Sequence, residues 1–284
     1  MLRSMTNDKT MWTEITREQY RRKGLRYSSD MTDSEWAVIE PLLPSAPHLG
    51  RPRTVEARAV VNGILYLATS GCQWRQLPKD FPPMTTVQRY FYRWRDDGTW
   101  ATINPALVMA VRERMGRDAS PTAGVIDSQS VKTTEAGGPR GYDAGKCIKG
   151  RKRHLLTDTN GLLVAAIVHA ADIQDREGAP TLLASVRGLF PWLRHVFADG
   201  GYAGPKLEAA LARIGTWSLE LIKRSDTAKG FELLPRRWVV ERTIAWLNRN
   251  RRLAKDFEAT LESARAFLYA ASIMLLTRRL AQSG

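Results

Sequence analysis

The stretch AGVIDSQSV, residues 123–131, decides the fold of this chain. Its apolar run Gly124–Ile126 ends at Asp127, a pattern typical of a buried β-strand whose last residue leaves the core. A carboxylate in that position is costly unless it is paired or binds a metal ion. Asp127 is therefore a candidate functional residue, although an aspartate that caps its strand through backbone amides fits the same pattern.

The segments that follow have the composition of strands alternating with helices. The further strands are predicted at RKRHLLTDT, GLLVAAIVHA, RHVFAD and WSLELI, the first two forming a hairpin around Thr159-Asn160-Gly161. Helices are predicted over residues 176–189, 205–214, 236–250 and 260–280. Five strands with helices between and after them predict an α/β sheet flanked by helices.

The part before the sheet has helical patterns only. Thr32 and Glu35 form a capping-box pattern, a second helix is predicted over 55–69, and Thr85 with Gln88 suggests another capping box before a third. Asn104-Pro105 predicts the start of a fourth helix. We therefore expect a basic N-terminal arm or leader at 1–30, an all-α region at 31–118 and the α/β region at 119–284.

The predicted helix over 85–98 resembles the recognition helix of a helix-turn-helix unit. Its apolar residues recur at helical spacing, which leaves Arg89, Arg93 and Arg95 largely on other sides. Such arginines read base edges and hold phosphates in the major groove. A solvated basic face on an ordinary helical region fits equally well, and the sequence leaves both interpretations open.

Composition favours a nucleic-acid partner. The chain has 43 Lys and Arg against 29 Asp and Glu, a net charge of +14, which favours a polyanion. Two cysteines and four scattered histidines support neither a disulfide framework nor a zinc cluster, and favour a cytoplasmic protein. The apolar run at 266–276 is too short to span a membrane.

Two more carboxylates complete a candidate site. Asp199 follows the apolar end of the RHVFAD strand and precedes Gly200-Gly201, and Glu241 lies on the predicted helix over 236–250. Arg237, one turn before Glu241, could orient that carboxylate or hold a phosphate beside it. The simpler interpretations are a turn-forming aspartate and a surface ion pair.

Three carboxylates at two strand ends and on a late helix would suit hard divalent cations, Mg²⁺ best, with Mn²⁺ expected to substitute. Two such ions activate water or a DNA 3′-hydroxyl and stabilise the departing oxygen without a covalent protein intermediate. Nearby basic residues are candidates to hold DNA phosphates. They are Lys146, Lys149, Arg151, Lys152 and Arg153.

An ordered series of motifs resembles the DDE transposases of bacterial insertion sequences, close to the insertion-sequence-five group. The motifs are MTDSEWAVIEPLLP, GRPR, GCQWRQLP, VIDSQSVKT, GRKRHLLTDTNG, FADGGY and RRWVVERTIAWLNRNRRL. The resemblance implies a ribonuclease H-like catalytic fold with Asp127, Asp199 and Glu241 as its acidic triad. It also implies a homodimer that pairs two element ends, with double-stranded DNA as partner and no nucleotide cofactor or membrane.

The last helix departs from the related insertion-sequence-four type. That type has Tyr, Arg, Glu and Lys in series, whereas this chain matches only Arg237 and Glu241, with Leu234 and Asn248 at the outer positions. The DNA contact of the missing lysine is then open to Arg249, Arg251 or Arg252. No large insertion domain is expected between Asp199 and Glu241.

The resemblance implies an enzyme that binds terminal inverted repeats, cleaves the element ends and joins the 3′-hydroxyls to target DNA. Two alternatives remain at this point. One is a metal-dependent nuclease on the same fold that does not join strands, and the other is an inactive DNA-binding repressor. The presence of all three carboxylates weighs against the repressor.

Overall fold

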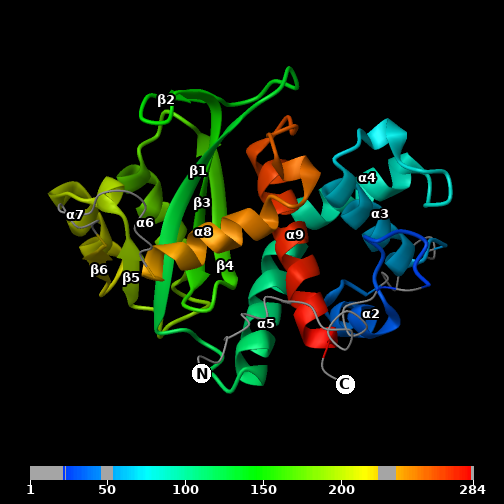
Figure 1. Ribbon diagram of the computed structural model, residues 1–284, viewed down its shortest axis with the longest axis horizontal. Coiled ribbons are helices and arrows are strands. Elements are labelled where there is room, and N and C mark those ends of the chain that lie inside the picture. The colour runs from blue at the N-terminus through cyan, green and yellow to red at the C-terminus, as the bar shows by residue number, and fades with distance from the viewer. Residues whose placement is uncertain (1–21, 23, 46–53, 223–234, 283–284) are drawn as a thin grey trace, which may run out of the picture.

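The computed structural model describes residues 22, 24–45, 54–222 and 235–282 (Figure 1). Its helices are α2 (Asp33–Ile39), α3 (Ala57–Ser70), α4 (Met84–Asp96), α5 (Thr99–Arg114), α6 (Asp175–Val186), α7 (Pro205–Ile214), α8 (Pro235–Leu247) and α9 (Leu261–Ala281). Its strands are β1 (Ala123–Lys132), β2 (Gly141–Asp143), β3 (Ile148–Asp158), β4 (Leu163–Ala170), β5 (His195–Ala198) and β6 (Ser218–Leu221). Most of the expected N-terminal arm, and Leu234, lie outside the described residues.

The strands form one mixed sheet, as the sequence predicts. Their order is β2-β3-β1-β5-β6, with β4 also paired to β3. Strand β1 is antiparallel to β3 and parallel to β5, and β5 is parallel to β6. The five predicted strands are all present, whereas β2 was missed because three residues are too few to show a period.

Helices cover both faces of the sheet. Helix α8 lies across β1 (Figure 1) and contacts β1, β3 and β5, while α6 contacts β1, β3 and β4. Consecutive side chains of β3 point to opposite faces of the sheet. Lys152 bonds to Asp175 of α6, whereas Arg153 donates to the Leu253 carbonyl, in the segment that follows α8. Neighbouring residues of β1, such as Asp127 and Ser128, therefore point to different environments.

Two predictions about the helix starts were wrong and one is confirmed. The Thr32 hydroxyl accepts from the Glu35 amide at 3.2 Å and the Glu35 carboxylate accepts from the Thr32 amide at 3.0 Å, a complete capping box. Helix α4 instead begins at Met84 without a side-chain cap. Thr85 therefore lies inside the helix and not at its cap, and the Gln88 side-chain amide donates to the Tyr92 hydroxyl at 3.1 Å.

Asn104 does not cap a helix, because α5 already begins at Thr99. The fully buried Asn104 side chain donates to the Leu163 carbonyl and accepts from the Ser272 hydroxyl, each at 2.7 Å. Asn104 thus ties α5 to β4 and α9. Pro105 is tolerated inside the helix although it has no N–H for the backbone ladder.

The helical region and the sheet share one core. Helix α9, from the C-terminal part, packs against α2, α3, α4, α5 and β4, and Figure 1 shows it beside α5. At the N-terminal side, Arg26 donates to the Asp80 carbonyl at 2.7 Å. The division at residues 118 and 119 is therefore a prediction about function, since the packing is continuous across it.

Candidate active site

The register of two parallel strands sets Asp127 beside Asp199. Val125 of β1 pairs with Phe197 of β5, and each aspartate lies two residues further along its own strand direction. Parallel strands are about 4.8 Å apart, and a displacement of two residues returns to the same face of the sheet. The two carboxylates therefore lie level with each other on adjacent strands. Asp199 follows the end of β5, whereas the prediction that β1 ends at Asp127 was wrong, because β1 continues to Lys132.

Arg237 connects the third carboxylate to this pair. Its Nη2 lies 3.3 Å from Glu241 Oε1, one turn further along α8, and 3.7 Å from Asp199 Oδ2. The Arg237 side chain is 30% exposed and that of Glu241 is 48% exposed, so solvent reaches this side of the group. Arg237 thus contacts two of the three predicted carboxylates and acts on the third, Asp127, only electrostatically.

Asp127 is the most enclosed of the three. The pKa of its carboxyl is raised to about 6, chiefly by burial and also by the negative charge of Asp199, whereas the Ser128 backbone N–H, Lys146 and Arg237 act to lower it. The Ser128 amide donates to Asp127 Oδ1 at 2.7 Å. Asp199 is held in turn by the Gly201 amide, at 2.8 Å from its Oδ1. Both aspartates are therefore oriented by backbone donors.

The donor set fits a hard divalent cation, since all three candidate ligands are carboxylate oxygens. Among the described residues, however, no three Asp, Glu, His or Cys side chains are grouped closely enough to hold a metal ion. The Arg237 guanidinium contacts two of the carboxylates and supplies positive charge there. A metal ion would compete with that guanidinium for the same oxygens.

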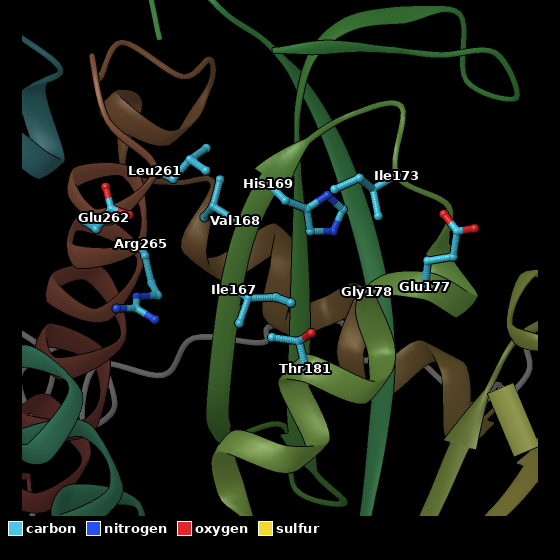
Figure 2. A pocket seen from close by; sticks show the side chains of 10 residues that line it. All are labelled: Ile167, Val168, His169, Ile173, Glu177, Gly178, Thr181, Leu261, Glu262 and Arg265. Carbon is cyan, nitrogen blue, oxygen red and sulfur yellow. The ribbon is translucent and has the colours of Figure 1, made fainter. Parts of the chain in front are cut away.

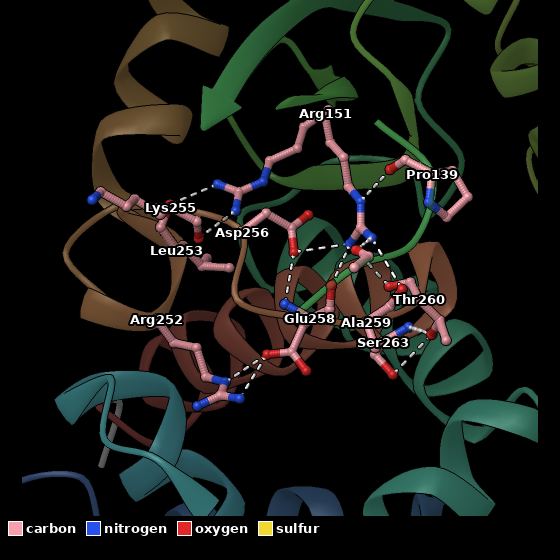
Figure 3. Close-up of polar contacts among 12 residues, drawn as sticks. Pro139, Arg151, Arg252, Leu253, Lys255, Asp256, Glu258, Ala259, Thr260 and Ser263 are labelled. Atoms are coloured by element: carbon pink, nitrogen blue, oxygen red, sulfur yellow. Dashed lines mark hydrogen bonds and ion pairs between the residues drawn. The ribbon is translucent and has the colours of Figure 1, made fainter. Parts of the chain in front are cut away.

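Three basic residues of β3, Arg151, Lys152 and Arg153, are buried inside the protein. Figure 3 shows the contacts of Arg151. Arg151 is 0% exposed, and its guanidinium donates to Asp256 and to the carbonyls of residues 137, 139 and 258–260. Arg153 donates to the Leu253 and Lys255 carbonyls. Lys152 is bonded to Asp175 at 2.8 Å. We therefore reassign Arg151, Lys152 and Arg153 from DNA contacts to interior structure, because phosphates cannot reach enclosed side chains.

The other predicted cations differ in their exposure. Six of them are exposed to solvent, namely Arg89, Arg93, Lys146, Lys149, Arg249 and Arg251. Arg95 instead pairs with Asp96 and donates to Ser263 of α9 at 2.8 Å. Arg252 is buried, where it pairs with Glu258 at 2.7 Å and donates to the Cys72 carbonyl. Arg95 and Arg252 thus join parts of the fold.

A polar cluster on the other face of β1 was not predicted. Buried His154 lies 3.5 Å from the Tyr202 hydroxyl and 3.9 Å from the Asp175 carboxylate. Burial, with His169 next, lowers the His154 pKa to about 3. Asp175 pairs with Lys152. Alternation along β1 could have indicated this cluster, because Ser128 must face away from Asp127.

A cavity of 290 Å³ lies apart from the three carboxylates (Figure 2). It is bordered by β4, α6 and α9, with His169, Glu177 and Arg265 among its lining residues. Figure 2 shows these side chains around the opening. The candidate site for chemistry is therefore the open group around Arg237 and not this cavity.

Comparison with known proteins agrees with the fold. The family "Transposase DDE domain" matches residues 118–277, and "Putative transposase of IS4/5 family" matches residues 31–104. The chain belongs to the DDE transposases. Its relatives include the Burkholderia cepacia "Putative transposase for insertion sequence element IS402", 36% identical over 51% of this chain and 69% of that protein.

Two further relatives have no stated activity. One is the "Insertion element IS402 uncharacterized 16.2 kDa protein" of Burkholderia cepacia, 32% identical over 37% of this chain and 74% of its own length. The other is "Uncharacterized protein y4sN" of Sinorhizobium fredii, 28% identical over 29% of this chain and 64% of its own length.

Membership of this family confirms the predicted class of protein. The mixed sheet with flanking helices is a ribonuclease H-like DDE domain, preceded by a helical region. The family consists of DNA-acting enzymes that generally use divalent metal ions. No described helix is both long and apolar enough to cross a membrane.

Proposed function

We propose that this enzyme binds the terminal inverted repeats of its insertion sequence, cleaves the element ends and transfers the 3′-hydroxyl strands to target DNA. The observation that carries the proposal is the common register of Asp127 and Asp199 on adjacent parallel strands, with Glu241 joined to Asp199 through Arg237. This is an all-oxygen donor set, and solvent reaches it on the side of Arg237 and Glu241.

Asp127, Asp199 and Glu241 are the proposed catalytic carboxylates and would hold Mg²⁺, two ions per site, with Mn²⁺ as a substitute. When bound, such ions supply activation of the attacking hydroxyl and stabilisation of the departing oxygen. The Ser128 and Gly201 amides orient Asp127 and Asp199. Arg237 balances the charge of two carboxylates and, once released from them, is a donor for a DNA phosphate.

Exposed cations on three elements are the proposed DNA contacts. Arg89 and Arg93 lie on α4, Arg249 and Arg251 follow α8, and Lys146 and Lys149 flank the start of β3. We assign α4 and the helical region at 31–118 to end recognition, and residues 119–284 to catalysis. Pairing of two ends by a homodimer and action at the nucleoid in the cytoplasm are part of the same proposal.

The test is cleavage and joining of a labelled duplex that contains the genomic sequence flanking the coding region, with Mg²⁺ or with EDTA. The wild type is expected to nick the duplex and join its 3′ ends to a second DNA only with Mg²⁺. Glu241→Gln is expected to slow both steps by at least about 100-fold, because it removes a proposed metal ligand. Glu262→Gln, the same change at an exposed glutamate of α9, is the matched control.

Other outcomes identify the alternatives. Nicking without joining would show a nuclease, and binding without nicking would show an inactive DNA-binding protein. If Asp127→Asn, Asp199→Asn and Glu241→Gln all cleaved at the wild-type rate, the assigned site would be wrong. The outcomes therefore separate the location of the site from the reaction it performs.

A further inference from the structure

The turn between β2 and β3 is built to hold Lys146 in one place. Asp143, which is buried, accepts from the Lys146 backbone amide at 3.1 Å and also bonds to the Ser130 hydroxyl. Cys147 has a φ of 52°, the positive φ of a non-glycine residue. Backbone conformations of this kind persist where the surrounding contacts enforce them and are common at functional sites.

The Lys146 ammonium is directed to β1 beside Asp127. Its Nζ lies 2.9 Å from the Ser128 carbonyl oxygen and 3.0 Å from the Ser128 hydroxyl. Because β5 pairs with β1 only over Ala123–Val125, Lys146 supplies a hydrogen bond that a longer neighbouring strand would otherwise make. The lysine thus bonds to β1 beyond the residues that pair with β5.

One donor of this ammonium remains for a ligand. Lysine has three N–H donors, and two of them bond to Ser128, while the residue itself is exposed to solvent. Arg237 of α8 is the second nearby cation, and both residues act electrostatically on the Asp127 carboxylate. A phosphate bound at Asp127 would therefore lie near two positive charges.

We propose that Lys146 is a catalytic residue that donates its remaining N–H to a non-bridging oxygen of the scissile phosphate. The inference rests on the proposed function and adds a charge-stabilising group to it. As water attacks phosphorus, the P–O3′ bond breaks with its electron pair passing to O3′. O3′ takes up a proton while the water loses one to solvent. Lys146 stays protonated and stabilises the charge on the phosphoryl oxygens.

Three substitutions separate the charge from the bonds to Ser128. Lys146→Met removes both, Lys146→Gln keeps a donor for the Ser128 carbonyl without the charge, and Lys146→Arg keeps the charge. Lys206→Met, a change at an exposed lysine of α7, is the matched control. The readouts are the cleavage rate at saturating duplex with Mg²⁺, the duplex Kd, and the Tm of each variant, which reports folding.

Lys146→Met and Lys146→Gln are expected to slow cleavage by about 100- to 1000-fold with the Kd within about threefold of the wild type. Lys146→Arg is expected to recover part of the rate, and Lys206→Met to keep it. A near-wild-type rate for Lys146→Gln would overturn the proposal, because the lysine would then only brace Ser128. A weaker Kd with an unchanged rate at saturation would also overturn it.

The same assay distinguishes this inference from the proposed function. If Glu241→Gln is inactive while Lys146→Met cleaves like the wild type, only the role of Lys146 is wrong. If Glu241→Gln cleaves like the wild type, the carboxylate site itself is wrong, and Lys146 loses its role with it.

Discussion

Two sets of basic residues that look alike in the sequence have opposite environments in the fold. Arg151, Lys152 and Arg153 on β3 are all buried, and their cationic groups are bonded to carboxylates or backbone carbonyls. Arg89 and Arg93 on α4 are exposed. The first set holds β3 to the segments around it, and only the second is open to DNA.

The comparison shows that a run of basic residues in the sequence does not indicate whether their side chains are buried or exposed. A buried cation is tolerated when its N–H donors have hydrogen-bond acceptors. Backbone carbonyls within residues 253–260 accept hydrogen bonds from the guanidinium groups of Arg151 and Arg153. An exposed arginine has no such requirement. Variants in the two sets should therefore affect different properties, stability in the first and DNA affinity in the second.

The largest expected effect is that of Arg151→Met on stability. The substitution removes the guanidinium and leaves Asp256 and several carbonyls without their donor (Figure 3). Loss of one partner from a buried ion pair costs about 3–5 kcal/mol. Urea unfolding should show this loss, with Arg249→Ala, at an exposed arginine, changing stability by at most about 0.5 kcal/mol. Equal losses of stability in the two variants would remove the distinction between buried and exposed cations.

A smaller effect on the free energy of unfolding is expected from His154, also on β3, as the pH falls from 7.5 to about 5. Burial lowers its native pKa to about 3 from an ordinary value of 6.5. Above pH 6.5 the imidazole is neutral in both states. Below it, the unfolded chain takes up a proton that the native protein excludes, so stability falls by up to about 1.4 kcal/mol per pH unit between pH 6.5 and 3.

His154→Gln should remove this part of the pH dependence. The measurement is the free energy of urea unfolding at a series of pH values between 7.5 and about 5, with EDTA present, for the wild type and the variant. The difference between the two proteins should be constant above pH 7 and change steadily below pH 6.5. Parallel curves throughout would show that this imidazole takes up a proton in the native protein.

The smallest effect is expected at single exposed arginines. Arg93→Ala should weaken duplex binding by about 1 kcal/mol and reduce the salt dependence of the binding constant by about one phosphate contact. Arg95→Ala is the matched comparison, because that side chain is bonded to Asp96 and Ser263 and should affect stability more than DNA affinity. Titrations at several salt concentrations would measure both. If Arg95→Ala alone weakened binding, the assignment of exposed and inward residues on α4 would be reversed.

Part of the candidate site followed from local sequence, and part did not. The strands that contain Asp127 and precede Asp199 were predicted because their apolar runs are a local pattern, whereas the continuation of β1 to Lys132 was not expected from a strand that ends at Asp127. The Thr32 capping box was predicted for the same reason. Asn104 was misread as a cap because its partners, Leu163 and Ser272, are far away in the chain.

The sequence by itself determined the succession of helices and strands, the family and the three candidate carboxylates, since each depends on a local period or an ordered motif. Only the tertiary structure decided which charges are enclosed, which cations remain open, and that Lys146 reaches Ser128 beside Asp127. Exposure and pairing depend on which distant segments pack together, and no local pattern of residue types contains that information.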